Sequence, residues 1–143
     1  MRSYHHEQTG PIYVVLVGLA AFLIAMGLLF HAAVPSGFVG ILLLATAIAF
    51  GRLIIDVDDR AVRWSMTFGW PCGTIPFDQI VHVQIVPVNF WMGIGIHLTF
   101  RGWVWNVSLG RGVQIMRPNG IAIVLGTDDP DALIEAISRA KAA

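Results

Sequence analysis

The feature that most constrains this chain is the run 11–50, which contains no Asp, Glu, Lys or Arg. One short segment, with Pro35, Ser36 and Gly37, interrupts it. Twenty helical residues rise about 30 Å, the thickness of the hydrocarbon core of a bilayer. The pattern therefore predicts two transmembrane helices, over 11–30 and roughly 34–50, joined by a tight turn.

The charges that flank these helices predict their orientation. Arg2 precedes the first helix, and Arg52, Arg60 and Arg63 follow the second. The turn between the two helices has no Lys or Arg, and His31 is its only titratable residue. The positive-inside rule then places both termini in the cytoplasm and the turn outside. A cleaved signal peptide and a buried helical hairpin fit less well, because the apolar run is long, double and without a polar face.

The rest of the chain, 52–143, has the size of one small domain with its own core. Of nine basic and nine acidic residues, only Arg2 and Glu7 lie before residue 52, so this domain is neutral. A neutral domain argues against nucleic acid as a partner, since that needs a basic face. Cys72 is the only cysteine, which excludes an internal disulfide, and we expect its role to be structural.

Short β-branched segments at intervals of about ten residues predict a β-rich domain. Residues 61–68 alternate with a period of two, as in a half-buried strand, and Asn119-Gly120 indicates a hairpin between 112–117 and 121–125. Asp129 and Pro130 then resemble the start of an amphipathic helix over about 129–142. We expect seven or eight antiparallel strands capped by this helix, and three segments: a tail (1–10), the hairpin (11–51) and the β domain (52–143).

The β domain contains an ordered set of motifs that is typical of a known family. It comprises Gly93-Ile94-Gly95-Ile96, Gly102-Trp103, Asn106-Val107-Ser108, Asn119-Gly120 and the closing 126–130 stretch Gly-Thr-Asp-Asp-Pro. The chain resembles small bacterial membrane proteins with one or two transmembrane helices and a pleckstrin-homology-like (PH-like) domain. The resemblance implies a PH-like antiparallel barrel or sandwich with a C-terminal helix, located at the bacterial inner membrane. It implies no reaction.

Several polar groups were weighed as sites, and a structural role is favoured for each. Asp56, Asp58 and Asp59 lack the glycine and distal glutamate of an EF-hand loop, and the aspartates at 128, 129 and 131 fit a helix cap. Asn106-Val107-Ser108 is a formal glycosylation sequon, but it lies in a predicted strand. His82 and His97 could bind a metal ion only with a third ligand, and the sequence offers none. If the structure brought Asp78, His82 and His97 together in a cleft, it would instead indicate an enzyme. We therefore predict no catalysis, cofactor or metal.

The aromatic residues are the remaining candidates for binding. Trp64 and either Trp103 or Trp105 are expected to fill the core, whereas the loop Phe90, Trp91 and Met92 is harder to bury and is the predicted contact site. We expect a non-catalytic, membrane-anchored interaction or scaffold module that binds a protein partner or a second copy. The alternatives are recognition of phospholipid head groups, by Arg52, Arg60 and Arg63 with support from Arg101 and Arg111, and an enzyme with a site hidden in the sequence.

Overall fold

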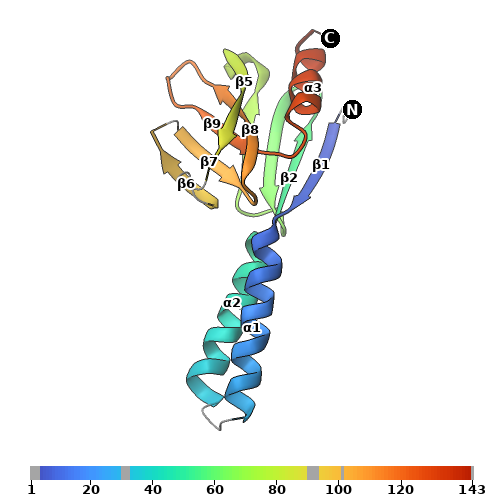
Figure 1. Ribbon diagram of the computed structural model, residues 1–143. Helices are drawn as coiled ribbons and strands as arrows, with labels where there is room; N and C mark the ends of the chain where they lie inside the picture. Colours follow the sequence, from blue (N-terminus) through green and yellow to red (C-terminus); the bar gives the residue numbers. More distant parts are fainter. Residues whose placement is uncertain (1–3, 30–32, 90–93, 101, 143) are drawn as a thin grey trace.

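The computed structural model describes residues 4–29, 33–89, 94–100 and 102–142, apart from the side chains at 12 and 33–36. A helical hairpin projects from a β-rich domain, and both chain ends lie on the β domain (Figure 1). The elements in chain order are β1 (Tyr4–Thr9), α1 (Pro11–Leu29), α2 (Ala33–Phe50), β2 (Arg52–Val57), β3 (Ala61–Met66), β4 (Cys72–Pro76), the 3₁₀ turn η1 (Phe77–Gln79), β5 (His82–Val88), β6 (Gly95–Thr99), β7 (Gly102–Asn106), β8 (Gly110–Met116), β9 (Ile123–Gly126) and α3 (Pro130–Ala142).

The helices α1 and α2 pack along each other through small residues. Ala20 and Ala47 are almost fully buried, and a Cβ added at Gly40 would lie 2.7 Å from Cγ1 of Ile24. The outward faces of both helices are apolar, with Val14, Phe22 and Phe38 each at least 60% exposed. A contiguous apolar surface of this kind marks a contact surface.

The predicted transmembrane hairpin is contradicted. Within the described part of the chain, no helix combines the length and the hydropathy needed to cross a membrane. The predicted fold class, which included a membrane hairpin, and the predicted location at the bacterial inner membrane both depended on these helices, so both predictions are wrong as well.

The N-terminal segment, which was expected to be a frayed tail, forms strand β1. It pairs antiparallel with β2 in a register that sets Tyr4 opposite Val57 and Thr9 opposite Arg52. The helical hairpin is therefore an insertion between two paired strands. At its base the N–H of Gly10 donates to the carbonyl of Gly51 over 3.0 Å, which holds the two connections together.

The strands form two sheets. Sheet A has the order β1-β2-β3-β4 and sheet B the order β5-β8-β9-β7-β6. All neighbours are antiparallel except β7 and β9, which run parallel with Trp103 opposite Ile123. The prediction of a purely antiparallel domain is wrong at this pair, because the β6–β7 hairpin joins the sheet on the far side of β9.

The main core lies between the two sheets and under α3. It contains apolar side chains of β2, β3, β8 and β9 with Leu133, Ala136 and Ile137 of α3. Asp129 caps this helix, since its Oδ1 accepts a hydrogen bond from the N–H of Ala132 over 3.2 Å. A smaller cluster of four valines, at 86, 88, 104 and 124, lies separately from the main core.

Candidate functional site

Three tryptophans and an arginine line an open hollow between the sheets. It has a volume of about 280 Å³ and is bounded by Trp64, Trp103, Trp105, Arg117 and Ile123. Sheet A contributes Trp64 from β3, and sheet B contributes the other four from β7, β9 and the end of β8. We call this hollow the tryptophan pocket.

Trp64 is the buried wall of the tryptophan pocket. It is 4% exposed, and its ring meets that of Trp105 edge to face, with centroids 5.8 Å apart. The partner of Trp64 on β4 is Gly73, and a Cβ there would lie 2.9 Å from Nε1 of Trp64 and closer still to Cζ2 and Cε2. The buried Nε1 finds no acceptor among the described residues. Because Nε1 is fully buried, a ligand in the hollow does not reach it unless the surrounding side chains move.

Strand β7 supplies the two other rings from one face. Trp103 and Trp105 are two residues apart and therefore point to the same side of the sheet, while Val104 between them is fully buried on the other. Trp103 is 42% exposed. The parallel pairing with β9 sets Ile123 beside it, which completes an apolar wall that is open to solvent at one end.

Among the residues that the structure describes, Arg117 is the only one with a charged side chain in the lining of the tryptophan pocket. Its Nε donates to the carbonyl of Ile121 over 3.0 Å across the turn that connects β8 to β9. Arg117 has no carboxylate partner among the described residues. By contrast, four other arginines form ion pairs with carboxylates: Arg52 with Glu7, Arg63 with Asp58, Arg111 with Asp131 and Arg139 with Glu135.

A wider groove of about 530 Å³ shares Trp103 with the pocket. Its residue Gln114 lies opposite Val124, on the face of sheet B that carries Val104, so the groove extends onto the other face of the sheet. The groove lies at the end of sheet B where β6 connects to β7 and β8 to β9. Its lining includes Leu98, Phe100 and Ile121, which are 64%, 91% and 45% exposed. We call it the adjoining groove. Exposed apolar side chains of this size around a concavity are typical of a surface that contacts another molecule.

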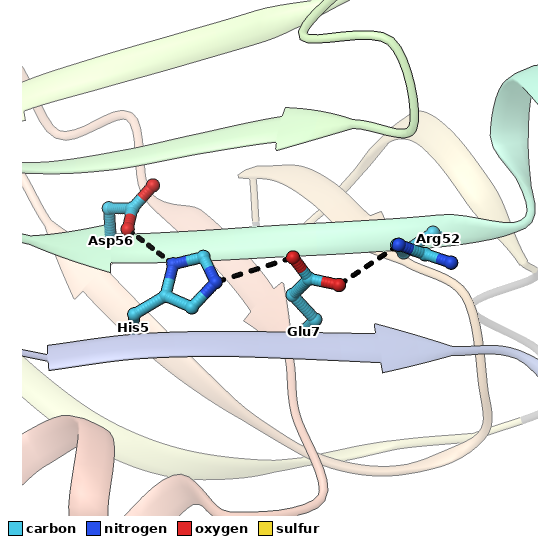
Figure 2. Close-up of polar contacts among 4 residues, drawn as sticks. All are labelled: His5, Glu7, Arg52 and Asp56. Atoms are coloured by element: carbon cyan, nitrogen blue, oxygen red, sulfur yellow. Dashed lines mark hydrogen bonds and ion pairs between the residues drawn. The ribbon is translucent and has the colours of Figure 1, made fainter.

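The structure does not test the predicted aromatic loop, because Phe90, Trp91 and Met92 lie outside the described residues. It does place the arginines proposed for lipid head groups. Arg52 ends a polar chain across β1 and β2, in which His5 contacts Asp56 at 2.6 Å and Glu7 at 3.3 Å, and Glu7 contacts Arg52 at 3.0 Å (Figure 2). Asp56 chiefly, through its hydrogen bond, raises the pKa of His5 above its usual value.

The aspartates near 58 form a turn. Oδ1 of Asp58 accepts hydrogen bonds of 2.8 Å from the backbone N–H groups of Arg60 and Ala61. The N–H of Arg60 contributes most to lowering the pKa of Asp58, and Arg63 at 3.0 Å adds to it. Two of the three arginines assigned to head groups, Arg52 and Arg63, are therefore paired with carboxylates.

The histidines and the sequon have structural positions. His82 lies on β5 and His97 on β6, the opposite edges of sheet B, so they cannot share a metal ion. Within the described residues, no group of three or more metal-ligating side chains exists. Asn106 is fully buried; its Oδ1 accepts from the N–H of Gly95 over 3.0 Å, and its Nδ2 donates to the carbonyl of Ser108.

Comparison with models of known protein families gave no match, and no curated protein matches the chain. The resemblance to PH-like membrane proteins therefore stays a prediction from the motifs.

Proposed function

We propose that this protein is a non-catalytic interaction module that binds a partner protein through the tryptophan pocket and the adjoining groove. The observation that supports this most is the position of Trp103, which is 42% exposed and borders both hollows. Tryptophan and arginine are the side chains most often found at the energetic centres of protein interfaces. Here Trp103 and Arg117 line the same hollow on sheet B.

The alternatives have less support in the geometry. Recognition of lipid head groups needs unpaired cationic side chains, but Arg52 and Arg63 each hold a carboxylate at 3.0 Å. Catalysis needs perturbed titratable groups that converge. Of the groups with a shifted pKa, His5 and Tyr4 lie on β1, Asp58 follows β2 and His97 lies on β6, and none of them lines the tryptophan pocket.

The test is selection from a displayed library of random peptides with free C-termini. The wild type should enrich a set of related peptides, and Trp103→Ala should lose their binding by about tenfold or more, as expected for a hot-spot side chain. Phe68→Ala is the matched control, because Phe68 is 71% exposed and lines neither hollow. Enriched peptides that bind Trp103→Ala as well as the wild type would overturn the proposal, as would the absence of any enrichment.

A further inference from the structure

We propose that β6 pairs with β6 of a second copy of this chain, antiparallel about a twofold axis at His97, and that Phe100 of each copy enters an apolar hollow beside the helical hairpin of the other. This inference goes beyond the proposed function, because no residue in the described lining of the tryptophan pocket lies on β6. The adjoining groove shares Leu98, Thr99 and Phe100 with the surface of the dimer.

Strand β6 is the last strand of sheet B and lies at the margin of the β domain, with β7 on its inner side (Figure 1). The backbone N–H of Trp103 on β7 donates to the carbonyl of Ala122, away from β6. Its partner on β6, Leu98, therefore belongs to a non-hydrogen-bonded pair, in which the backbone groups point away from the neighbouring strand. The same holds for Ile96, two residues earlier. The N–H and C=O groups of Ile96 and Leu98 thus face the open edge, where a further strand can pair with them.

The other three edge strands of the described sheets carry features that discourage pairing with another chain. Strand β1 contains Glu7, which forms an ion pair with Arg52. Strand β4 ends at Pro76, and β5 contains Pro87. Strand β6 has neither a proline nor an acidic or basic side chain other than His97, whose pKa is lowered by burial. The edge of β6 is therefore uncharged at neutral pH and open to a second strand.

The side chains of this edge complement themselves when two copies run antiparallel. A closed dimer is symmetric, so each residue of β6 meets its counterpart by a twofold rotation. With the axis at His97, Ile96 of each copy lies opposite Leu98 of the other, and these pairs exchange both backbone hydrogen bonds. Ile96 and Leu98 share one face of the strand, and Leu98 is 64% exposed, so the pairing covers apolar surface. The uncharged edge thus fits a second copy of itself without opposing like charges.

An apolar hollow of about 420 Å³ lies where this register brings Phe100. Both helices of the hairpin and the residues at the start of β6 line it: Tyr13, Leu16, Thr46, Ala47, Phe50, Gly51, Ile94 and Gly95. Because Gly95 of one copy lies opposite Thr99 of the other, Phe100 of the second copy comes next to Ile94. Phe100 is 91% exposed, and a Cβ added at Gly95 would meet nothing within 4 Å, so the approach is open. An aromatic ring that leaves water here adds a large apolar area to the contact.

Disulfide cross-linking of the full-length chain tests the register, with the exposed native thiol removed by Cys72→Ser. In this background His97→Cys should form a covalent dimer under mild oxidation, because opposed residues of a non-hydrogen-bonded pair have Cα atoms about 4.5 Å apart, within the span of a disulfide. Thr99→Cys is the matched control on the same face of β6. It lies opposite Gly95, about 13 Å along the strands from its own counterpart, and should stay uncross-linked. The absence of a His97→Cys dimer, or an equal yield from Thr99→Cys, would overturn the inference.

Sedimentation equilibrium of the full-length chain tests the surface. The wild type should be dimeric at about 50 µM, and Leu98→Asp should raise the Kd of the dimer by about tenfold or more, because it buries unpaired carboxylates between the strands. Val81→Asp is the matched control, since Val81 is also 64% exposed but lies outside β6, and it should leave the Kd unchanged. A monomeric wild type would overturn the inference. An unchanged Kd in Leu98→Asp would place any dimer contact elsewhere, and an equal loss in Val81→Asp would show that the effect is not specific to β6, so either result would overturn it too.

The hollow has its own variant in the same measurement. Phe100→Ala should raise the Kd of the dimer by about tenfold, as expected for a buried aromatic anchor, whereas Phe68→Ala, 71% exposed and distant in sequence, should not. An unchanged Kd in Phe100→Ala would overturn the insertion of Phe100. No peptide is present in these experiments, so a monomeric chain leaves the proposed function standing, and a failed peptide selection leaves the dimer standing.

Discussion

The placement of Trp64 over Gly73 can be tested by one methyl group. In Gly73→Ala, the new Cβ would lie 2.9 Å from Nε1 of Trp64 and nearer to two of its ring carbons, so the ring has to move. Trp64 is 4% exposed and packed against Trp105, which leaves little room for this movement. Overpacking of this kind costs about 1–3 kcal/mol of the free energy of unfolding.

The assay is thermal and urea unfolding followed by far-UV circular dichroism. Gly73→Ala should lower the melting temperature by several degrees, because about 1 kcal/mol corresponds to roughly 4–8 °C in a domain of 60–100 residues. Thr74→Ala, one exposed position further along β4, is the control and should change the free energy of unfolding by less than about 0.5 kcal/mol.

A double-mutant cycle identifies the cause of the loss. Trp64→Phe removes all three ring atoms that the new methyl group would meet, so Gly73→Ala should cost much less in that background, with a coupling energy of about 1 kcal/mol or more. An equal cost in both backgrounds would refute the reasoning, because the loss would then come from the backbone of β4 and the wall of the tryptophan pocket would be misplaced.

Three further predictions concern the elements around this site. Gly40→Leu should separate α1 from α2, because the Cβ of the new side chain would lie only 2.7 Å from Cγ1 of Ile24. Proteolysis within the hairpin should then become faster, and an unchanged rate would contradict the close approach of the two helices. Since Asp56 raises the pKa of His5 in the folded state, this pair stabilises the fold below the unfolded pKa of about 6.5 and loses its effect as the pH rises through the folded pKa. The stability difference between the wild type and His5→Gln should therefore shrink from pH 5 to pH 8 in chemical unfolding, and a difference that grows would show the opposite sign. Asp129→Ala should cost about 0.5–2 kcal/mol by loss of the α3 cap, measured by urea unfolding against the control Ser138→Ala, an exposed position later in α3.

The sequence predicts most of the local structure of the β domain, because the signals there are local. The alternation from Ala61 gives β3, the Asn119-Gly120 turn lies between β8 and β9, and Pro130 begins α3. Strand β1 escaped prediction because Tyr4–Thr9 is polar and has no period of its own. Its strand character comes from pairing with β2 across the inserted hairpin, which a local pattern cannot reveal.

The candidate site depends on long-range pairing and was predicted only in part. The prediction that Trp64 and either Trp103 or Trp105 fill the core is confirmed, since Trp64 belongs to the core and Trp105 packs against it. The spacing of Trp103 and Trp105 also shows that they share a face, but nothing in the sequence places Trp64 opposite them. Arg117 carries no local signal, since it looks like any arginine before a turn. Its position follows from the parallel pairing of β7 with β9, which brings the end of β8 next to Trp103.

The measurement that tests the central claim most directly is the response of the tryptophan indole N–H signals to a peptide selected from the displayed library, in ¹H–¹⁵N correlation spectra. The signals of Trp64, Trp103 and Trp105, which line the same pocket, should move together as the peptide is added. The signal of Trp70, which is 74% exposed and lines neither hollow, should stay in place. Stationary signals from the three pocket tryptophans at saturating peptide would contradict the account.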